Sequence, residues 1–300
     1  MTFIRLKSEP FSAGGINLKL HFSKMHGLKN DYVYINCLSE KLKHPQEVAR
    51  LISDRHCGVG SDGLILICPS DRADFAMRMF NMDGSEGNMC GNGIRCMGKY
   101  VYDHRLTEKT QGLAIETRSG VKYLDLTVEN GQVVWVSVDM GEASTCAKSV
   151  PVATDYDDFV SQPMLVCGEV YLVTCVSMGN PHAVIFCEEI DSLDLPVIGP
   201  LFEHHERFPE GVNTEFIQLI DRETLRMRVW ERGSGETFAC GTGACASVVA
   251  AVLNGHCDPD REITVHLRGG DLKITCTSDF TVRMRGPATH VFDGEIELDL

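Results

Sequence analysis

The sequence predicts an α+β protein made of two similar β-rich halves, each wrapped around one helix. Residues 77–93 and 227–243 share a Met-Arg pair, a glutamate and a Cys-Gly-x-Gly turn, separated by half of the 300-residue chain. Each stretch leads into a segment with helical periodicity. Most other apolar runs are short and bounded by turn residues, which is typical of strands. Many short strands with few helices favour the α+β class.

Composition and charge limit the kinds of partner that we expect. Lys+Arg number 28 and Asp+Glu number 42, so the net charge of -14 disfavours binding to nucleic acid or to anionic membranes. No apolar run has the length of a membrane span, and the first residues do not resemble a signal peptide. The 13 cysteines are therefore expected to be mostly buried thiols in a reducing cytoplasm.

In the first half, residues 1–19 are expected to form a poorly committed extension or a single edge strand. A strand is predicted at 32–35 and an amphipathic helix at 46–55. Residues 58–63 match G-x-G-x-x-G, the fingerprint of dinucleotide-binding sites. That fingerprint must follow a strand and open a helix, but here a buried strand at 64–67 follows it. We therefore reject a dinucleotide site.

Helices are predicted after both Cys-Gly-x-Gly turns. The first is expected to fade near Asp103. The second, residues 244–253, is apolar nearly all round and should be buried, and Asn254-Gly255 is a good helix stop. An Asn130-Gly131 pair predicts a hairpin. Further strands are predicted at residues 123–128, 133–138, 263–267, 272–276 and 281–284.

The two Cys-Gly-x-Gly turns, at Cys90 and Cys240, carry the functional interpretation. Glycines on both sides of one residue let the backbone turn sharply, and a helix that starts there presents N–H groups to an anion. A thiol at this helix start is expected to have its pKa lowered from about 8.5 towards neutrality. A single such turn with a buried thiol could be purely structural. Two copies, each preceded by a glutamate four residues earlier, favour a functional site.

Two thiols facing one carbon suit a stereoinversion. A base on one face and an acid on the other are required, and a thiol near its pKa can serve as either. The carboxylate held by the helix N-termini would be stabilised as an enediolate forms, without a metal or other cofactor.

The motifs around these turns resemble those of the diaminopimelate epimerase family, which is independent of pyridoxal phosphate. They cover residues 20 to 300 and are jointly specific. The matching stretches are Lys24-Met25-His26-Gly27, Asn30-Asp31, Asn81-x-Asp83-Gly84-Ser85-Glu86, Cys90-Gly91-Asn92-Gly93-x-Arg95-Cys96, Ser177-Met178-Gly179-Asn180-Pro181-His182, Gly211-Val212-Asn213, Glu231-Arg232-Gly233 and Cys240-Gly241-Thr242-Gly243-Ala244.

The resemblance implies two pseudo-symmetric barrel-like domains, residues 1–138 with 288–300 returning to the first, and residues 139–287. It implies a site in the cleft between them that converts LL- to meso-diaminopimelate in lysine and peptidoglycan precursor biosynthesis. Cys90 and Cys240 would be the catalytic thiols, assisted by His182 and Glu231, although packing explains His182 equally well. The implied substrate contacts are Asn30, Asn81, Gly91, Asn92, Asn180, Asn213, Glu231, Arg232, Gly241 and Thr242.

Two positions depart from the family pattern. Gly63 stands where many members have a substrate-contacting Gln, and Lys29 replaces the usual Gly of His-Gly-Leu-Gly-Asn-Asp. Both bear on substrate breadth. The alternatives are a racemase of histidine, glutamate or proline type, a cysteine hydrolase, and a thiol-rich metal or redox protein. We expect no cofactor and no metal, and a small diamino diacid as the ligand; a homodimer is the candidate assembly.

Overall fold

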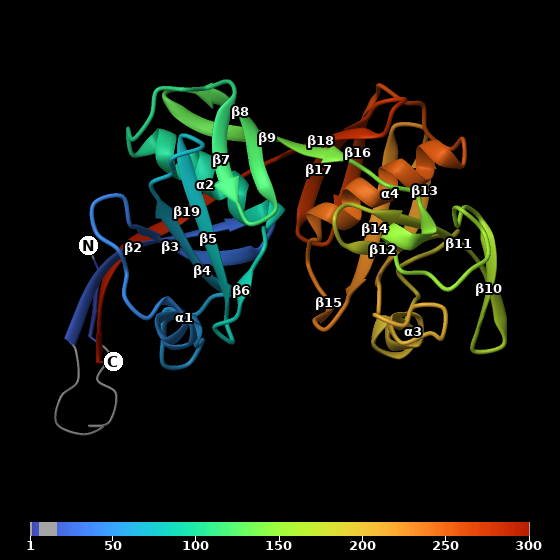
Figure 1. Cartoon of the computed structure of the whole chain (residues 1–300), viewed down its shortest axis with the longest axis horizontal. Helices are drawn as coiled ribbons and strands as arrows, with labels where there is room; N and C mark the ends of the chain where they lie inside the picture. Colours follow the sequence, from blue (N-terminus) through green and yellow to red (C-terminus); the bar gives the residue numbers. More distant parts are fainter. Residues whose placement is uncertain (1, 6–16, 300) are drawn as a thin grey trace. The chain divides into compact units, whose positions relative to one another are not determined.

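The computed structural model describes residues 2–5 and 17–299. The chain forms two compact units, unit 1 with residues 1–138 and 287–300, and unit 2 with residues 139–286 (Figure 1). The domain boundaries that we expected from the sequence remain a prediction. The part of the predicted N-terminal extension at residues 6–16 lies outside the described residues, while β1 (Thr2–Arg5) pairs in parallel with β19 (Thr289–Asp299).

Unit 1 places one mixed sheet around a long helix. Its further described elements are β2 (Asn17–Gly27), β3 (Asn30–Asn36), α1 (Pro45–Ser53), β4 (Gly63–Cys68), β5 (Phe75–Asn81), β6 (Glu86–Gly87), α2 (Gly91–Asp103), β7 (Leu113–Thr117), β8 (Gly120–Glu129) and β9 (Gln132–Glu142). Neighbouring strands run in the order β19, β2, β3, β4, β5, β7, β8 and β9. The β3–β4 and β5–β7 pairs are parallel.

Unit 2 repeats this topology. Its described elements are a short 3-10 turn (Ala147–Ser149), β10 (Gln162–Val166), β11 (Glu169–Ser177), β12 (Pro181–Phe186), α3 (Leu195–Glu203), β13 (Asn213–Asp221), β14 (Thr224–Glu231), β15 (Gly235–Glu236), α4 (Gly241–Leu253), β16 (Glu262–Leu267), β17 (Gly270–Cys276) and β18 (Thr281–Gly286). Here β12–β13 and β14–β16 are the parallel pairs. In unit 1, β19 pairs with β2 as β10 pairs with β11 in unit 2.

The strand registers of the two units coincide. Tyr32 lies opposite Gly63 between β3 and β4, and His182 lies opposite Asn213 between β12 and β13. Both pairs are related by the same half-chain offset as Cys90 and Cys240. The duplication inferred from the sequence therefore extends to the pairing of individual residues, and positions can be compared one to one between the units.

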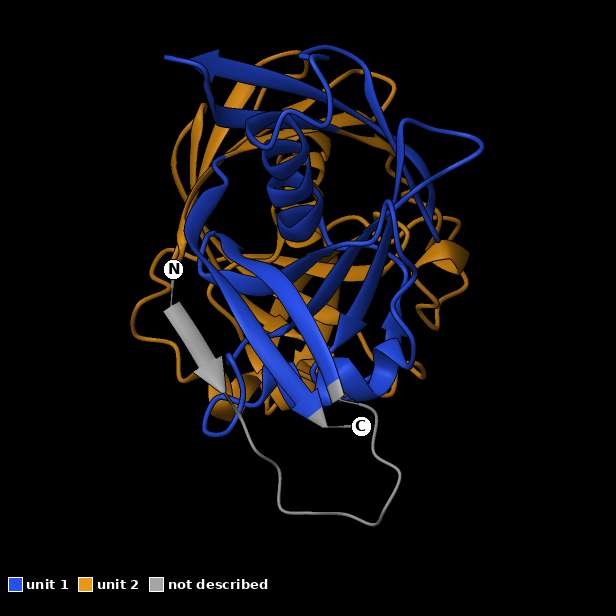
Figure 2. Cartoon of the chain, turned by 90° about the vertical axis from the view of Figure 1, so that its left-hand side faces the viewer, with its two compact units in different colours: residues 1–138, 287–300 blue, residues 139–286 orange. Residues whose placement is uncertain are grey.

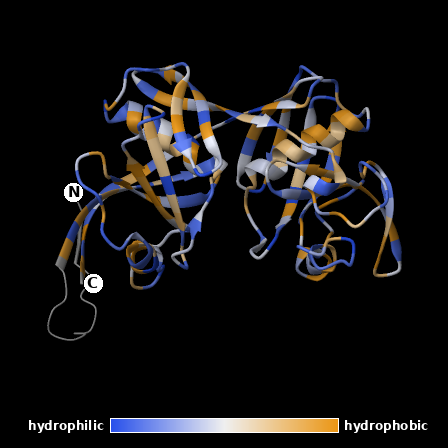
Figure 3. Cartoon of the chain, in the orientation of Figure 1, coloured by the Kyte–Doolittle hydropathy of each residue, from blue (hydrophilic) through white to orange (hydrophobic). Residues whose placement is uncertain are grey.

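The two long helices are enclosed, as predicted. Figure 2 shows strands of unit 1 curving around its long helix, and α2 is buried from Gly91 to Val101. In unit 2, α4 packs on β11, β13 and β17, and hydrophobic colours follow much of its length in Figure 3. Its end at Asn254, followed by Gly255 with φ 71°, confirms the predicted stop. Because these helices are buried, their N-termini are surrounded mainly by protein and not by water.

The shorter helices cover the other side of each sheet. In unit 1, Val48 and Ile52 of α1 join Leu64 and Phe80 in one apolar cluster. In unit 2, Phe202 of α3 belongs to a cluster that includes Phe216, and their rings meet edge to face at 5.5 Å. Within the described residues, no helix is both long and apolar enough to span a membrane.

The predicted turns are confirmed. Asn130 and Gly131, with φ of 51° and 77°, connect β8 to β9 in the left-handed conformations of a two-residue hairpin loop. Residues 58–63 lie after α1 and run into β4. They do not open a helix, which agrees with the rejection of a dinucleotide site.

Candidate active site

Each of the two cysteines caps a long helix. Cys90 precedes α2 and Cys240 precedes α4, both with extended backbone, and each sulfur accepts a hydrogen bond of 3.3 Å from the N–H group three residues later. Each thiol thus occupies the position that Ser or Asp takes in an ordinary N-cap. The predicted helix starts and thiol positions are therefore confirmed in both units.

The glycine that closes each turn has no space for a side chain. A Cβ on Gly93 would lie 2.6 Å from Ile65 Cδ1, and a Cβ on Gly243 would lie 2.5 Å from Glu215 Oε1. Both contacts are far below normal van der Waals distance, so these glycines let each turn pack directly against the sheet. Position 65 in unit 1 corresponds to position 215 in unit 2.

The expectation of a lowered thiol pKa is wrong for the protein without substrate. Burial raises the pKa of the Cys90 thiol, although N–H groups of the turn and the nearby Arg95 charge act in the opposite direction. Burial, followed by the carboxylates of Glu231 and Glu215, raises the pKa of Cys240 well above its ordinary range. Loss of hydration outweighs the helix N-terminus in both cases, which disfavours the thiolate form of both cysteines.

In unit 1, the Cys90 thiol donates to Asn30 Oδ1 at 3.3 Å, and Asn92 Nδ2 donates to the same oxygen at 3.2 Å. The other end of the Asn30 amide, Nδ2, donates to Asp62 Oδ2 at 2.8 Å. Since a carboxylate only accepts, Asp62 fixes which way the amide points. Three of the predicted unit 1 residues, Cys90, Asn30 and Asn92, are therefore brought together.

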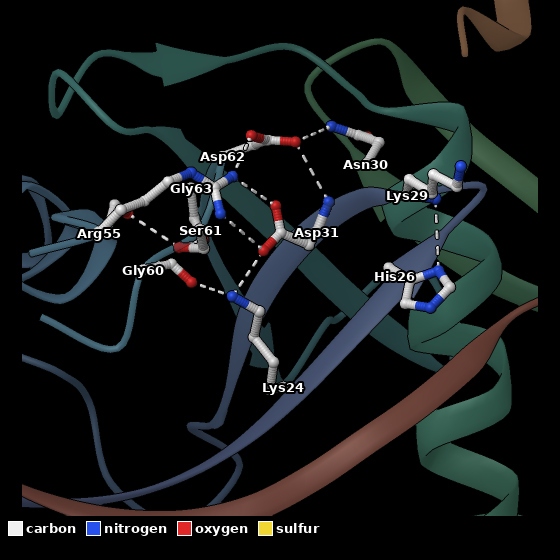
Figure 4. Close-up of polar contacts among 11 residues, drawn as sticks. Lys24, His26, Lys29, Asn30, Asp31, Arg55, Gly60, Ser61, Asp62 and Gly63 are labelled. Carbon is white, nitrogen blue, oxygen red and sulfur yellow. Dashed lines mark hydrogen bonds and ion pairs between the residues drawn. The ribbon is translucent and has the colours of Figure 1, made fainter. Parts of the chain in front are cut away.

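Behind Asn30 lies a network of charged side chains, shown in Figure 4. Arg55 bridges Asp31 and Asp62 with contacts of 2.8 Å to each. Lys24, which is nearly buried, pairs with Asp31 at 2.6 Å and also donates to the Gly60 carbonyl. Through Arg55 these contacts hold Asp62, the carboxylate that anchors Asn30, and sequence reasoning did not assign a role to Asp62 or Arg55.

Tyr32 is a further unit 1 residue that sequence reasoning missed. Its side chain is buried, and its hydroxyl hydrogen-bonds to the Cys90 sulfur. Burial and the neighbouring sulfur raise the pKa of Tyr32 well above its ordinary range, so the hydroxyl keeps its proton. It can therefore act as a donor to Cys90. The sequence did contain a signal for this residue, because Tyr32 occupies the position in unit 1 that corresponds to His182 in unit 2.

In unit 2, Asn180 again contacts the thiol turn. Its Nδ2 donates to Thr242 Oγ1 at 3.3 Å, and Thr242 Oγ1 lies 3.5 Å from the Cys240 sulfur. The other end of the amide, Oδ1, lies 3.1 Å from His182 Nε2. His182 has no exposed surface. The predicted residues Cys240, Thr242, Asn180 and His182 therefore form one hydrogen-bonded series.

Two carboxylates lie near Cys240. Glu231 was predicted, and burial raises its pKa while the Thr237 hydroxyl donates to it at 2.5 Å. Glu215 was missed. It is fully buried on β13, and its Oε1 lies 2.7 Å from His182 Nδ1. A charged residue directly before the apolar pair Phe216-Ile217 was the available signal, because unpaired buried carboxylates are rare.

Asn213 and Arg232 are joined at the end of β14. The Asn213 side chain donates to the Pro181 carbonyl at 2.8 Å and accepts from the Arg232 backbone N–H at 2.9 Å. The exposed Arg232 guanidinium donates to the Glu210 carbonyl at 3.0 Å. Asn213 therefore shapes the turn that carries Arg232, and the substrate contacts of both stay a prediction.

Asn81 and the duplicated glutamates Glu86 and Glu236 lie in the hairpins before the thiols. Asn81 Nδ2 donates to Ser85 Oγ at 3.0 Å. Glu86 pairs with Arg78 at 2.8 Å, and Glu236 pairs with Arg228 at 2.9 Å. These duplicated glutamates thus clamp duplicated arginines across each hairpin. Each pair joins the two strands of the hairpin that precedes a thiol turn, so the recurring glutamates have a structural role there.

Gly63 and Lys29, the two positions that depart from the family pattern, have different local surroundings. At Gly63, a Cβ would lie 2.1 Å from the Phe80 carbonyl oxygen, so this backbone has no space for a glutamine. Leu28 and Lys29, with φ of 56° and 70°, form the loop between β2 and β3. Lys29 is exposed and takes a conformation that favours glycine.

Solved structures share the duplicated fold. A PhzF-family phenazine biosynthesis protein from Bacillus anthracis matches with a TM-score of 0.68 and 16% identity, over 93% of this chain and 99% of that chain. A hydroxyproline epimerase from Agrobacterium vitis matches with a TM-score of 0.67 and 12% identity, over 94% of this chain and 93% of that chain. The chain therefore has the two-domain α+β fold of this structural class.

Sequence comparison is more specific. The family model described as diaminopimelate epimerase matches residues 22–146 and 174–291. A diaminopimelate epimerase from Acetivibrio thermocellus is 54% identical over 281 residues, covering 93% of this chain and 99% of the relative. One from Methanococcus maripaludis is 53% identical over 280 residues, covering 93% of this chain and 100% of the relative. The chain is thus an isomerase. It belongs to the diaminopimelate epimerase family.

Proposed function

We propose that this chain interconverts LL- and meso-diaminopimelate in lysine and peptidoglycan precursor biosynthesis, by proton transfer at one α-carbon. One observation carries the proposal: a cysteine thiol that caps the start of a buried helix occurs twice, in a chain that is 54% identical to a diaminopimelate epimerase. A hydrolase would use one thiol, and a metal protein would use neither in this way.

In the proposed mechanism, one cysteine of the pair Cys90 and Cys240 first gives its proton to solvent and becomes the base, while the other keeps its proton. The thiolate takes the α-proton, and the electron pair of the broken C–H bond moves into the carboxylate as an enediolate. The S–H group of the other cysteine then gives its proton to the opposite face of the carbon, which inverts the centre. Each turnover leaves the two thiols with exchanged protonation states, ready for the reverse reaction.

The turn N–H groups supply the electrostatic stabilisation. We propose that the backbone at Gly91-Asn92 and Gly241-Thr242 holds the reacting carboxylate, where the helix N-termini favour the charge that develops in the enediolate. Because these groups are held rigidly by buried helices, they need little reorganisation during the reaction.

The remaining predicted residues would hold the distal end of the substrate. A diamino diacid offers a second carboxylate, which an arginine fork binds in two places, and a second ammonium, which carboxylates and amide oxygens accept. The residues proposed for this role are Asn30, Asn81, Asn180, Asn213, Glu231 and Arg232. His182 and Glu231 are proposed to assist Cys240, since both belong to its polar surroundings.

A cytoplasmic location, catalysis without a cofactor and a homodimeric assembly complete the proposal. They follow from the sequence and the family resemblance, and each stays a prediction.

The function is tested by incubating dialysed, chelator-treated protein with LL-diaminopimelate and following the meso isomer by chiral separation. Proline, glutamate and histidine are assayed in parallel. We expect turnover of diaminopimelate alone. No turnover of diaminopimelate beside clear racemisation of another amino acid would reject the proposed substrate.

A further inference from the structure

Glu215 is a buried carboxylate with an incompletely satisfied side chain. It lies on β13 with no exposed surface, and its Oε1 is 2.7 Å from His182 Nδ1. Its second oxygen, Oε2, has no hydrogen-bond partner among the described residues. A buried charge without full pairing is costly, so its retention at this place requires a reason.

The contacts of Glu215 lead to the thiol turn in four steps. The carboxylate lies 2.7 Å from His182 Nδ1, and the other ring nitrogen, Nε2, lies 3.1 Å from Asn180 Oδ1. Both neighbours of the ring are acceptors, so each contact requires an N–H on the ring nitrogen. The opposite end of that amide donates to Thr242 at 3.3 Å, and Thr242 lies 3.5 Å from the Cys240 sulfur. The orientation of an amide is set by its partners. Glu215 therefore determines which end of Asn180 faces the thiol turn.

Glu215 also lies close to the turn itself. A Cβ on Gly243 would be 2.5 Å from Glu215 Oε1 and 3.2 Å from the Cys240 sulfur, so both groups border the same point. The Glu215 charge contributes to raising the pKa of the Cys240 thiol. The matching position in unit 1 is Ile65, next to Gly93, which has no charge. The carboxylate is therefore a feature of the second unit and not of the duplicated frame.

We propose that Glu215 is a positioning residue of the Cys240 half of the site, a role that rests on the function proposed above. It holds the His182 ring, and through it the Asn180 amide, in the orientation that the thiol turn and the substrate require. It also places a negative charge beside the Cys240 sulfur, since both groups border the same point at Gly243.

The test uses the full chain with three variants: Glu215→Gln, His182→Gln and the double variant. Glu215→Gln keeps the shape of the side chain and removes its charge. We expect kcat/KM for diaminopimelate to fall by about 10- to 100-fold, the scale of a misplaced catalytic group. If Glu215 acts through His182, the two substitutions are not additive, and Glu215→Gln should cost less than about threefold in the His182→Gln background.

A matched control checks for a general packing defect. Thr214 is the neighbour on the same strand, and its buried hydroxyl has no hydrogen-bond partner among the described residues. Thr214→Val removes that hydroxyl at nearly constant volume and should keep wild-type kinetics. Circular dichroism and thermal unfolding establish that all variants are folded before their rates are compared.

A second readout does not depend on the substrate. Alkylation of the free protein by iodoacetamide, followed peptide by peptide by mass spectrometry, reports the thiolate fraction of each cysteine. The titratable groups nearest Cys240 are Glu231, Glu215 and His182. Loss of one negative charge should speed alkylation of Cys240 several-fold in Glu215→Gln and leave Cys90 as an unchanged internal reference.

The outcomes separate this inference from the proposed function. Wild-type protein that does not epimerise diaminopimelate contradicts the function, while faster Cys240 alkylation in Glu215→Gln still supports the role of Glu215. Folded Glu215→Gln protein with wild-type kcat/KM, or with unchanged Cys240 alkylation, overturns the role of Glu215 even when the wild type is an active epimerase.

Discussion

The two units contain the same thiol turn with different surroundings. In both, a cysteine caps a buried helix, and an asparagine 60 residues earlier, Asn30 or Asn180, contacts the turn. The amides point in opposite directions: Asn30 presents its carbonyl to the turn, whereas Asn180 presents its NH2 group. The duplication has thus kept the backbone frame and allowed the polar groups to diverge.

The divergence changes the electrostatic surroundings of each thiol. Cys90 donates to a neutral amide oxygen, and the corresponding strand position is the apolar Ile65. Cys240 is instead flanked by the carboxylates of Glu215 and Glu231, which oppose formation of a thiolate. A two-thiol inversion needs a base and an acid, so unequal surroundings would let the two cysteines respond differently to the same substrate.

The largest effect is expected on removal of either thiol. Cys90→Ala and Cys240→Ala should each reduce epimerisation by at least about 10³-fold, because one face of the α-carbon then lacks its acid or base. The rate is measured by chiral separation of the product. Cys57→Ala and Cys146→Ala, at exposed cysteines, serve as controls and should remain active. A near wild-type rate in either single variant would show that the thiols are not an acid–base pair.

Arg232→Lys should cost about 10- to 100-fold in kcat/KM. The substitution keeps the charge and loses the two-point fork, and hydrogen bonds to charged groups contribute about 1.5–3 kcal/mol. Steady-state kinetics with diaminopimelate measure the loss. Arg222→Lys is the control, since this exposed arginine pairs with Asp258. Equal kinetics in both variants would place Arg232 outside the binding site.

Asp62→Asn tests the orientation of the Asn30 amide in unit 1, for comparison with that of Asn180 in unit 2. Its new amide can donate as well as accept, so it no longer fixes the direction of the Asn30 amide. We expect a loss of about 10-fold in kcat/KM. The electrostatic effect proposed for Glu215 does not apply here, so alkylation of Cys90 and Cys240 should not become faster. An unchanged rate would mean that Asn30 is oriented by Cys90 and Asn92 alone.

The smallest effect is expected for Lys29→Gly. Lys29 has φ 70°, and a left-handed conformation costs a residue other than glycine about 1–2 kcal/mol. The substitution should raise the free energy of unfolding by about 1 kcal/mol, measured by urea denaturation at constant m value. Lys43→Gly is the control, because Lys43 is exposed and lacks positive φ. No difference between the two variants would contradict strain at Lys29.

Local sequence patterns predicted most of the elements. The β-strands at 64–67 and 263–267, the hairpin at Asn130-Gly131 and the apolar helix before Asn254 are all confirmed. Each of these follows from periodicity or turn chemistry within a short window. The thiol turns were found for the same reason, since Cys and Gly spacing is visible without knowledge of the fold.

The partners of those turns could not be predicted in the same way. Asp62 reaches Asn30, and Glu215 reaches His182, across parallel strands whose register is set by the whole sheet. The thiol pKa values went in the opposite direction from the prediction because burial, which depends on tertiary packing, outweighed the helix N-terminus. The half-chain offset fixed which positions correspond but not which of them carry charge.

The most direct test of the two-thiol inversion is the fate of the α-proton in D2O. Wild-type protein is incubated with LL-diaminopimelate, and deuterium in the meso product and in the recovered LL substrate is measured by mass spectrometry at low conversion. Because a separate thiol, already exchanged with solvent, delivers the new proton, the product should carry deuterium while the recovered substrate remains unlabelled. Equal labelling of both isomers from the start, or a product that retains the original hydrogen, would contradict proton transfer by two opposed thiols.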